Sequence, residues 1–563
     1  MEILSHENLS SRAKIYFNAI SNSAKTVVFI FILLFLAAFS SSRWIGKHSF
    51  PSISANTGLK FPWITTQPSS QPSPLPKAQP NRKPSSQSLT CSSKSPSNSC
   101  PTHPSQSHNN SLSPTPPPIP PPFPQPNCPD YFRWIHEDLR PWSATGISRE
   151  MLDLAAPLAA FRLIIVDGHP YIHHYHPVFQ TRDLFTIWGI LQLLRRYPGQ
   201  IPDLDLMFNC EDMPVVHAPN GGRSPPPLFR YCKDDTTLDI VFPDWSFWGW
   251  PEVNIRPWNT LAEELNEANE RLPWREREPY AYWKGNPDVA GTRGDLMKCN
   301  VTDKKDWEAR LFRVNWVKEG RRRFKHSNLA DQCSYRYKVY IEGRAWSVSE
   351  KYILGCDSPT LYVQSRFQDF VSRGLRPGLH YWPIPQNDKC RAIKQAVEWG
   401  NSHPAEIQAM GKRGSSFIHE SLHMNYVYDY MLHLLTEYSK LLTFKPTKPE
   451  DAMDLCLESE ACPSHGKVRE FLMESMAAEP ISNDSEPCNL PSGFQPSELK
   501  QLLMEKTTDG TKMVVESMIR RSHGGKRLSG SGFGIRGEVL GLLLVGTWSS
   551  VGGLLVFHLW GPS

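Results

Sequence analysis

Residues 335–356 read YRYKVYIEGRAWSVSEKYILGC, and this stretch indicates the fold class. Its first part, residues 335–341, alternates side chains in the manner of a β-strand. Ser347 and Glu350 then have the spacing of a capping box, which predicts a helix from Ser347 to about Cys356. Because a helix start carries free backbone N–H groups, this loop would suit a phosphate group. A strand, a loop and a helix in this order are typical of an α/β fold.

Strand-like and helix-like segments also alternate in the rest of residues 128–442. Two apolar runs at 161–166 and 170–175 flank Asp167-Gly168, which predicts a β-hairpin. The remaining pattern predicts strands at 204–209, 281–283 and 361–363, and helices at 181–196, 390–400, 404–413 and 415–442. The whole region is therefore expected to form an α/β catalytic unit.

Several charged residues lie where predicted strands end. The strand at 204–209 runs into Cys210-Glu211-Asp212-Met213-Pro214, and Pro214 ends regular pairing. Glu211 and Asp212 are thus expected at the carboxyl end of a strand, where open α/β sheets bind ligands. Arg293 and Arg344 each lie in a glycine-bearing loop after a predicted strand. These loops are candidates for an anion site.

The segment 242–258 (FPDWSFWGWPEVNIRPW) combines aromatic side chains with Asp244, Glu252 and Arg256. Aromatic rings and carboxylates together can hold a sugar ring, through packing of its C–H face and hydrogen bonds to its hydroxyl groups. An aromatic loop inside a protein core has the same composition. From this segment alone, both interpretations stay open.

Two further patterns allow a metal site. Asp203-x-Asp205 resembles the acidic pair with which many glycosyltransferases hold a metal on a nucleotide diphosphate, although a solvated strand edge explains it equally. The second pattern is a histidine group on the predicted hairpin: His169, His173, His174 and His176. Neighbouring strand residues point to opposite faces, so surface or partly buried histidines are favoured over zinc ligands.

Residues 1–127 have a different composition. Residues 26–42 (TVVFIFILLFLAAFSSS) lie between Lys25 and Arg43, which predicts an uncleaved signal-anchor with residues 1–25 as a cytosolic tail. A cleaved signal peptide is the alternative. Residues 43–127 follow, with 20 Pro and 17 Ser between 51 and 126, and are expected to form a disordered, extended stem. The apolar segment 539–560 could be a second membrane span, although its glycines weaken this prediction.

The cysteines and sequons indicate the compartment. Twelve dispersed cysteines without a C-x-x-C motif, in a chain with an apolar N-terminal segment, predict disulfides among most of Cys128 to Cys488 in an oxidising lumen. Asn109, Asn300 and Asn483 would then be glycosylation candidates. The expected location is the Golgi or endoplasmic reticulum membrane, as a single-pass type II protein. The net charge of only +5 argues against nucleic acid as a partner.

Five segments in order carry a resemblance to a known family: FNCEDMP (208–214), FPDWSFWGWPE (242–252), YAYWKGNPDVAGTRGDLMKCN (280–300), residues 335–356, and FVSRGLRPGLHYWPI (370–384). Together they resemble the Rumi-type protein O-glucosyltransferases of glycosyltransferase family 90, and LCLESEACP (455–463) is most similar to the plant branch. The resemblance implies a GT-B fold with two Rossmann-like lobes. Residues 128–445 would form the catalytic domain, 446–517 a C-terminal extension, and 518–563 an atypical tail.

The resemblance also implies a reaction. It would be an inverting, metal-independent transfer of glucose or xylose from a UDP-sugar to a hydroxyl of a protein or polysaccharide, without a cofactor. Asp212 would be the general base. The implied UDP-sugar contacts are Glu252, Arg256, Trp258, Lys284, Arg293, Arg344, Ala345, Trp346, Ser347 and Ser349; at Lys284, relatives often have Arg. Two alternatives remain, namely a metal-dependent GT-A-like transferase using Asp203 and Asp205, and a non-catalytic, membrane-tethered carbohydrate-binding protein.

Overall fold

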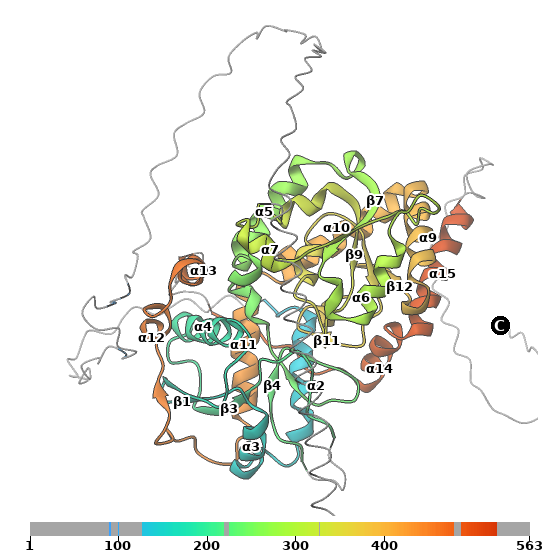
Figure 1. Ribbon diagram of the computed structural model, residues 1–563. Helices are drawn as coiled ribbons and strands as arrows, with labels where there is room; N and C mark the ends of the chain where they lie inside the picture. Colours follow the sequence, from blue (N-terminus) through green and yellow to red (C-terminus); the bar gives the residue numbers. More distant parts are fainter. Residues whose placement is uncertain are drawn as a thin grey trace, which may run out of the picture. The chain divides into compact units, whose positions relative to one another are not determined.

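The computed structural model describes residues 89, 91, 100, 126–218, 224–325, 327–477 and 486–525. All of them belong to one compact unit of the chain, residues 83–563. Figure 1 shows two groups of strands in this unit, each with its own helices. We call them the first lobe and the second lobe. The prediction of an α/β architecture for this region is confirmed.

The first lobe contains a mixed sheet of six strands. Their spatial order is β13 (Met453–Asp454), β2 (His169–His174), β1 (Phe161–Val166), β3 (Leu204–Phe208), β4 (Phe229–Arg230) and β6 (Ile240–Val241). The predicted hairpin is present as β1 and β2, and its turn residues Asp167 and Gly168 have φ of 51° and 76°, as a type I′ turn requires. Since β1 pairs with β3 antiparallel, only β3, β4 and β6 form a parallel, Rossmann-like part.

Helices cover the first sheet. The helix α4 (Arg182–Arg196) matches the prediction from apolar periodicity. It packs together with α11 (Met424–Ser439), which also contacts β3 and α2 (Trp134–Leu139). The other elements associated with this lobe are α3 (Arg149–Ala155), β5 (Cys232–Lys233), β11 (Gln368–Asp369), α12 (Leu457–Ala461) and α13 (Gly466–Ala477).

The second lobe contains a parallel sheet of five strands. Their order is β12 (Trp382–Ile384), β10 (Thr360–Val363), β9 (Tyr335–Tyr340), β7 (Glu278–Gly285) and β8 (Ala309–Arg313). Along the chain, β7 is followed by β8 on one side, and β9, β10 and β12 then extend the sheet on the other side. The direction of winding therefore reverses between β7 and β9. In doubly wound sheets, ligands bind at the carboxyl ends of the strands next to such a switch point.

The helices of the second lobe and its surroundings are α5 (Trp258–Arg271), α6 (Gly291–Leu296), α7 (Trp316–Arg321), α8 (Glu350–Leu354), α9 (Lys389–Ser402), α10 (Pro404–Ser416), α14 (Pro496–Glu505) and α15 (Thr508–Gly525). The boundary expected between 517 and 518 lies inside α15.

Two helix predictions were wrong. The single helix expected over 415–442 is interrupted: α10 ends at Ser416, a π-helical turn follows, and α11 begins at Met424 after His423 caps it. The helix expected from Ser347 begins at Glu350 and is only five residues long. Its capping box does not form, because the Ser347 hydroxyl contacts Arg293 and Ser349, while the Glu350 carboxylate accepts a hydrogen bond from Tyr362.

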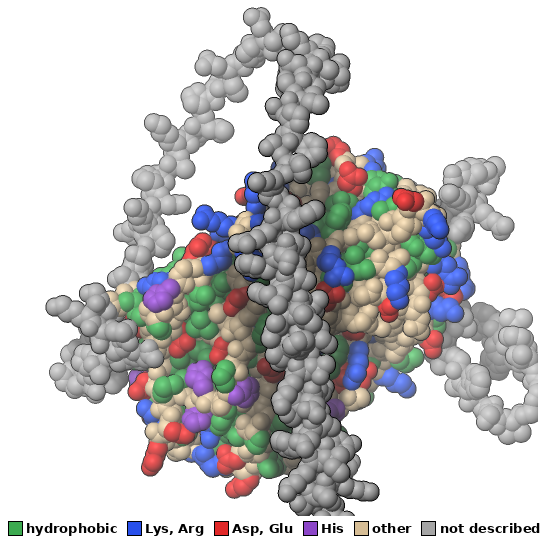
Figure 2. Space-filling view, in the orientation of Figure 1, with side chains coloured by type: hydrophobic (Ala, Val, Ile, Leu, Met, Phe, Trp, Pro, Cys, Tyr) green, Lys and Arg blue, Asp and Glu red, His purple; other side chains and the backbone are tan. Residues whose placement is uncertain are grey.

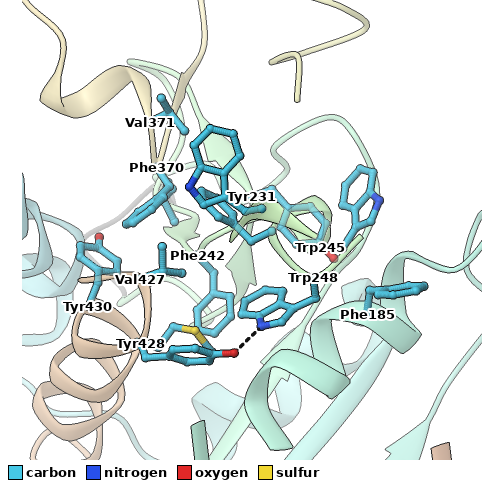
Figure 3. Close-up of a cluster of buried hydrophobic side chains, with 14 of the residues drawn as sticks. Phe185, Tyr231, Phe242, Trp245, Trp248, Phe370, Val371, Val427, Tyr428 and Tyr430 are labelled. Atoms are coloured by element: carbon cyan, nitrogen blue, oxygen red, sulfur yellow. Dashed lines mark hydrogen bonds between the residues drawn. The ribbon is translucent and has the colours of Figure 1, made fainter. Parts of the chain in front are cut away.

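Aromatic side chains fill the core between the first sheet and α11 (Figure 3). Trp248 donates a hydrogen bond from Nε1 to the Tyr428 hydroxyl over 3.0 Å, and Phe242 and Trp245 lie in the same cluster. Trp245, Trp248 and Trp258 are each at most 1% exposed. Of the two interpretations of the segment 242–258, the aromatic core therefore holds for these residues.

Five disulfides join distant parts of the chain: Cys91–Cys462, Cys100–Cys456, Cys128–Cys488, Cys299–Cys390 and Cys333–Cys356. Only Cys210 and Cys232, both buried, are free among the described cysteines. The predicted pairing of most cysteines from Cys128 to Cys488 is confirmed. The expectation that the whole stem is a separate spacer needs a correction, because Cys91 and Cys100 form disulfides with cysteines on either side of α12.

The predicted location needs a correction. Within the part of the chain that the structure describes, no helix has the length and apolar character needed to cross a membrane. This finding contradicts the expected single-pass type II anchor in the Golgi or endoplasmic reticulum membrane. The tail 1–25, the predicted anchor 26–42 and the apolar segment 539–560 lie outside the described residues. Asn109 and Asn483 lie outside them too.

Candidate active site

Three of the predicted site residues meet at the switch point of the second sheet. Arg293 lies in α6, after β7, and Ser347 and Ser349 lie in the loop after β9. Arg293 Nη2 donates to Ser347 Oγ over 2.9 Å, and the hydroxyls of Ser347 and Ser349 are 2.8 Å apart. Arg293 Nε donates to the Glu342 carbonyl over 2.8 Å. The ends of β7 and β9 therefore hold one guanidinium and two hydroxyl groups as a connected group.

The Arg293 guanidinium is partly buried and forms no ion pair among the described residues, although the Glu342 carboxylate acts on it electrostatically. Its hydrogen bonds within the described residues all go to backbone carbonyls or to the Ser347 hydroxyl. Burial lowers the pKa of Arg293, although an arginine remains protonated in proteins. A cation that is partly removed from water and has no ion-pair partner is costly, and an anionic ligand would supply opposite charge in direct contact. This group is therefore suited to bind a phosphate.

The loop between β9 and α8 places the other predicted residues differently. Arg344 is exposed at its start, whereas Ala345 and Trp346 are buried. The Trp346 ring lies 5.4 Å from Tyr231 and 5.9 Å from Trp245, both in the first lobe, and so joins the two lobes beside Ser347. Lys284 lies near the end of β7, opposite Phe312 of β8, and is half-buried.

Three predicted sugar contacts are not brought to this group. Arg256 forms ion pairs with Glu264 and with Glu474, the latter over 2.7 Å. Trp258 starts α5, is 1% exposed, and donates to the Leu422 carbonyl over 3.0 Å. Glu252 accepts a hydrogen bond from Thr181 over 3.0 Å. Sequence spacing alone cannot show that the charge of Arg256 and the ring of Trp258 are already used within the fold.

Asp212 lies in the first lobe, in the loop that follows β3. Arg182 Nη1 is 3.1 Å from Asp212 Oδ1, and the Asp212 side chain is 28% exposed. Hydrogen bonds fix the backbone of the surrounding loop. Arg230 donates to the carbonyls of Glu211 and Met213, and the Cys232 thiol donates to the Asp212 carbonyl. The carboxylate is therefore presented to solvent from a rigid backbone.

A short aromatic path connects the two groups across the lobe boundary. The Arg182 guanidinium lies 4.5 Å from the centre of the Trp245 ring, which contacts Trp346, the residue before Ser347. Asp212 and the Arg293 group thus lie on opposite lobes with Trp245 and Trp346 between them.

The residues of the metal hypotheses are engaged elsewhere. Asp205 is fully buried and accepts two hydrogen bonds from Arg162, over 2.7 and 2.6 Å. Asp203 accepts from the backbone N–H of Asp167 over 2.7 Å, so the two carboxylates do not form one open site. His173 lies 2.9 Å from Asp451. In the described ranges, the one group with metal-ligand spacing is Cys128, His433 and Cys488, and its two sulfurs form a disulfide.

Two features of the site escaped the sequence analysis. One is Arg182, a basic residue in the first turn of a helix, where the helix dipole disfavours a cation; that mismatch was the available signal. The other is a cavity of about 460 Å³ at the ends of β10 and β12, which none of the predicted site residues lines. It is lined by the turn at Asp234–Thr236, by residues 364–368 and by α14 and α15. Its walls come from three distant segments, which sequence spacing does not connect.

The surface and the remaining sequon add less. In Figure 2, Lys and Arg side chains are interspersed with Asp and Glu on the visible face. The Asn300 amide forms two hydrogen bonds with the backbone of Leu311, over 3.0 and 2.9 Å. This side chain therefore serves to fix the loop before β8 in the folded protein.

A guanidinium and two hydroxyl groups at the switch point of a parallel sheet lie where α/β enzymes bind their ligands. The comparisons name the family. The chain belongs to glycosyl transferase family 90, whose family model matches residues 124–517, and it is a glycosyltransferase.

Curated relatives agree with this assignment. The chain is 26% identical over 342 residues to O-glucosyltransferase rumi of Drosophila pseudoobscura pseudoobscura, an alignment that covers 58% of this chain and 81% of the relative. It is 27% identical over 341 residues to protein O-glucosyltransferase 1 of Rattus norvegicus, covering 58% and 83% of the two chains. The similarity thus spans most of each relative, and the expectation of a Rumi-type family member is confirmed.

Proposed function

We propose that the protein transfers glucose or xylose from a UDP-sugar to a hydroxyl group, with inversion at the anomeric carbon and with Asp212 as general base. The family supports the transfer of a sugar, and the relatives' names support a protein hydroxyl as acceptor. A polysaccharide hydroxyl is the second acceptor class. The two-lobed arrangement supports a GT-B fold, although the first sheet is only partly parallel.

The diphosphate of the donor would bind at the switch point. Arg293, Ser347 and Ser349 supply a partly buried cation and two hydroxyl groups, and the exposed Arg344 can add a second charge from the rim. The single observation that carries this proposal is the Arg293 guanidinium, which is partly buried beside Ser347 and forms no ion pair among the described residues. With side chains that neutralise the leaving diphosphate, the transfer would need no metal ion.

The sugar would lie between the two lobes, near Trp346. Lys284 at the end of β7 is a further candidate for donor contact, and as a point charge it would hold a phosphate without the paired hydrogen bonds of an arginine. The positions of Arg256 and Trp258 remove them from this proposal. Glu252 stays near the site only through Thr181, which precedes Arg182 at the start of α4.

The transfer then takes one step. Asp212 accepts the proton of the acceptor hydroxyl while the oxygen forms a bond to the anomeric carbon. The bond between that carbon and the diphosphate oxygen breaks, and its electron pair leaves with UDP. Attack from the face opposite the leaving group inverts the configuration. The carboxylate on one lobe and the phosphate group on the other suit this geometry.

Release of UDP from a panel of UDP-sugars tests the proposal. The full-length protein is incubated with each donor, with and without an acceptor protein or glycan. We expect release with UDP-glucose or UDP-xylose and weaker release with the others. Binding of UDP measured by calorimetry accompanies the assay. A protein that binds no UDP and releases none from any donor would contradict the proposal.

A further inference from the structure

Arg182 is the group in direct contact with the Asp212 carboxylate. The two side chains are 3.1 Å apart, and Arg182 is 6% exposed while Asp212 is 28% exposed. Arg182 Nη1 also donates to the Cys210 carbonyl over 3.1 Å, so the same nitrogen bridges the backbone and the side chain of the loop after β3. The position of the carboxylate is therefore tied to the position of the guanidinium.

The guanidinium is itself held by aromatic rings. It lies 4.5 Å from the centre of the Trp245 ring, 5.1 Å from that of Phe179 and 5.9 Å from that of Trp250. Cations over aromatic faces are stabilised, the more so when they are removed from water. Arg182 Nε is buried without a hydrogen-bond partner, so packing rather than hydrogen bonding fixes this part of the side chain.

The backbone that carries Arg182 is fastened as well. Gln180 has a φ of 59°, a left-handed conformation that a residue with a side chain adopts only when its surroundings enforce it. Its amide oxygen accepts a hydrogen bond from Trp250 Nε1 over 2.9 Å, and the Thr181 hydroxyl donates to Glu252 over 3.0 Å. Two consecutive residues thus bind the start of α4 to the turn at Trp250–Glu252.

We infer that Arg182 is a positioning residue for the transfer reaction, and that it holds Asp212 with one carboxylate oxygen directed at the acceptor. This inference rests on the proposed function, in which Asp212 is the base. Oδ1 accepts the Arg182 hydrogen bond, and among the described residues no hydrogen bond reaches Oδ2. Oδ2 is therefore the atom that takes the acceptor proton. A base fixed in this way needs no reorganisation as the proton moves.

The test compares Arg182→Met and Arg182→Lys in the full-length protein. Met keeps length and apolar contacts but removes the charge; Lys keeps the charge but loses the planar fork. We expect kcat to fall by about 10²-fold or more in Arg182→Met, within the range found for general-base catalysis, and by less in Arg182→Lys. The KM for the UDP-sugar should stay within about threefold, because the donor binds on the other lobe.

A double variant separates positioning from loss of structure. In the Asp212→Asn background, Arg182→Met should lower kcat by less than about threefold, since a residue that acts through Asp212 has little left to contribute. Arg195→Met on the same helix is the matched control, because Arg195 is partly buried but lies about 20 Å farther along α4. It should leave kcat unchanged.

Three outcomes would overturn the inference. They are an unchanged kcat in Arg182→Met, an equal and additive loss in the Asp212→Asn background, and an equal loss in Arg195→Met. Each of these can be observed while the wild-type protein transfers sugar normally. Failure of the proposed function is a different result, namely that the wild-type protein turns over no UDP-sugar. Melting temperatures of all variants exclude samples that have not folded.

Discussion

At the scale of single residues, Arg293 determines what the second lobe can bind. Its charge is enclosed by backbone carbonyls and the Ser347 hydroxyl, and none of the ion pairs among the described residues includes it. Carbonyl groups orient the guanidinium but cannot neutralise it. A bound diphosphate would do so, and the two serine hydroxyls beside it would add donors to the same anion.

Replacement of Arg293 by Ala tests this role. A hydrogen bond that involves a charged group contributes about 1.5–3 kcal/mol, so we expect the Kd for UDP to rise roughly 10- to 100-fold. Arg391→Ala is the control, because Arg391 is exposed and pairs only with Asp388 three residues away. Calorimetric titration with UDP gives both values. Equal affinities for UDP in Arg293→Ala and wild type would show that the diphosphate does not bind at Arg293.

At the scale of elements, the short turn before β12 contains a histidine that the fold keeps neutral. His380 Nδ1 accepts the backbone N–H of Arg376 over 3.1 Å, and its ring stacks on Phe417. Burial, with Arg413, Arg376 and Lys506 nearby, lowers the pKa of His380 to about 4. The unfolded chain takes up this proton near its ordinary pKa of about 6.5, so between pH 6.5 and 4 it binds more protons than the folded chain.

Stability should therefore fall as the pH drops from about 6.5 to 4, because protonation of His380 favours the unfolded chain. His380→Gln keeps a hydrogen-bond acceptor but cannot titrate, and it should flatten this part of the profile. Urea unfolding at several pH values measures it. An unchanged slope in His380→Gln would assign the acid sensitivity to other groups.

The disulfides connect elements that are far apart in the chain, and their pattern predicts a thiol count. Ten cysteines are paired, so only Cys210 and Cys232 of the twelve should react when the unreduced protein is labelled in denaturant. The same labelling after reduction should find twelve thiols. Four or more reactive thiols before reduction would mean that at least one of these bonds is absent.

Most elements could be predicted from the sequence because their signals are local. The Asp167-Gly168 turn, the apolar periodicity of α4 and the alternation of β9 each lie within one short segment. The Ser347 capping box failed for a reason outside its segment: Arg293, more than fifty residues earlier in the chain, takes the hydroxyl. The position of Asp212 after the carboxyl end of β3 was predicted correctly. The contacts of Trp258 with Leu422 and of Arg256 with Glu474 could not be predicted, because these partners are more than 150 residues away in the chain.

At the scale of the whole molecule, buried charges help to join segments that are 235 residues apart in the chain. Arg373, after β11, forms two hydrogen bonds with the Asp138 carboxylate in α2, over 2.6 and 2.7 Å. Both side chains are at most 1% exposed. Lys233 also approaches Asp138, and these cations keep the pKa of the carboxyl below its usual value despite its burial. The ion pair between Arg373 and Asp138 therefore fixes α2 against the segment that follows β11.

Removal of one partner should be costly, because it leaves the other charge buried alone. We expect Asp138→Ala to lower the free energy of unfolding by about 3–5 kcal/mol. The control is Asp295→Ala, which removes the exposed ion pair between Lys298 and Asp295. It should change the free energy of unfolding by less than about 1 kcal/mol. Denaturant titrations of both variants measure the difference. Similar losses in the two variants would contradict a structural role for the buried pair.

The central claim is that Asp212, held by the first lobe, takes the acceptor proton while the second lobe holds the leaving diphosphate. The most direct measurement is the transfer rate of Asp212→Asn beside its affinity for UDP, on the same samples and with EDTA present. The account predicts a loss of roughly 10²- to 10⁴-fold in kcat, an unchanged Kd for UDP, and a wild-type rate that EDTA does not reduce. Transfer by Asp212→Asn at close to the wild-type rate, or loss of wild-type transfer in EDTA, would contradict it.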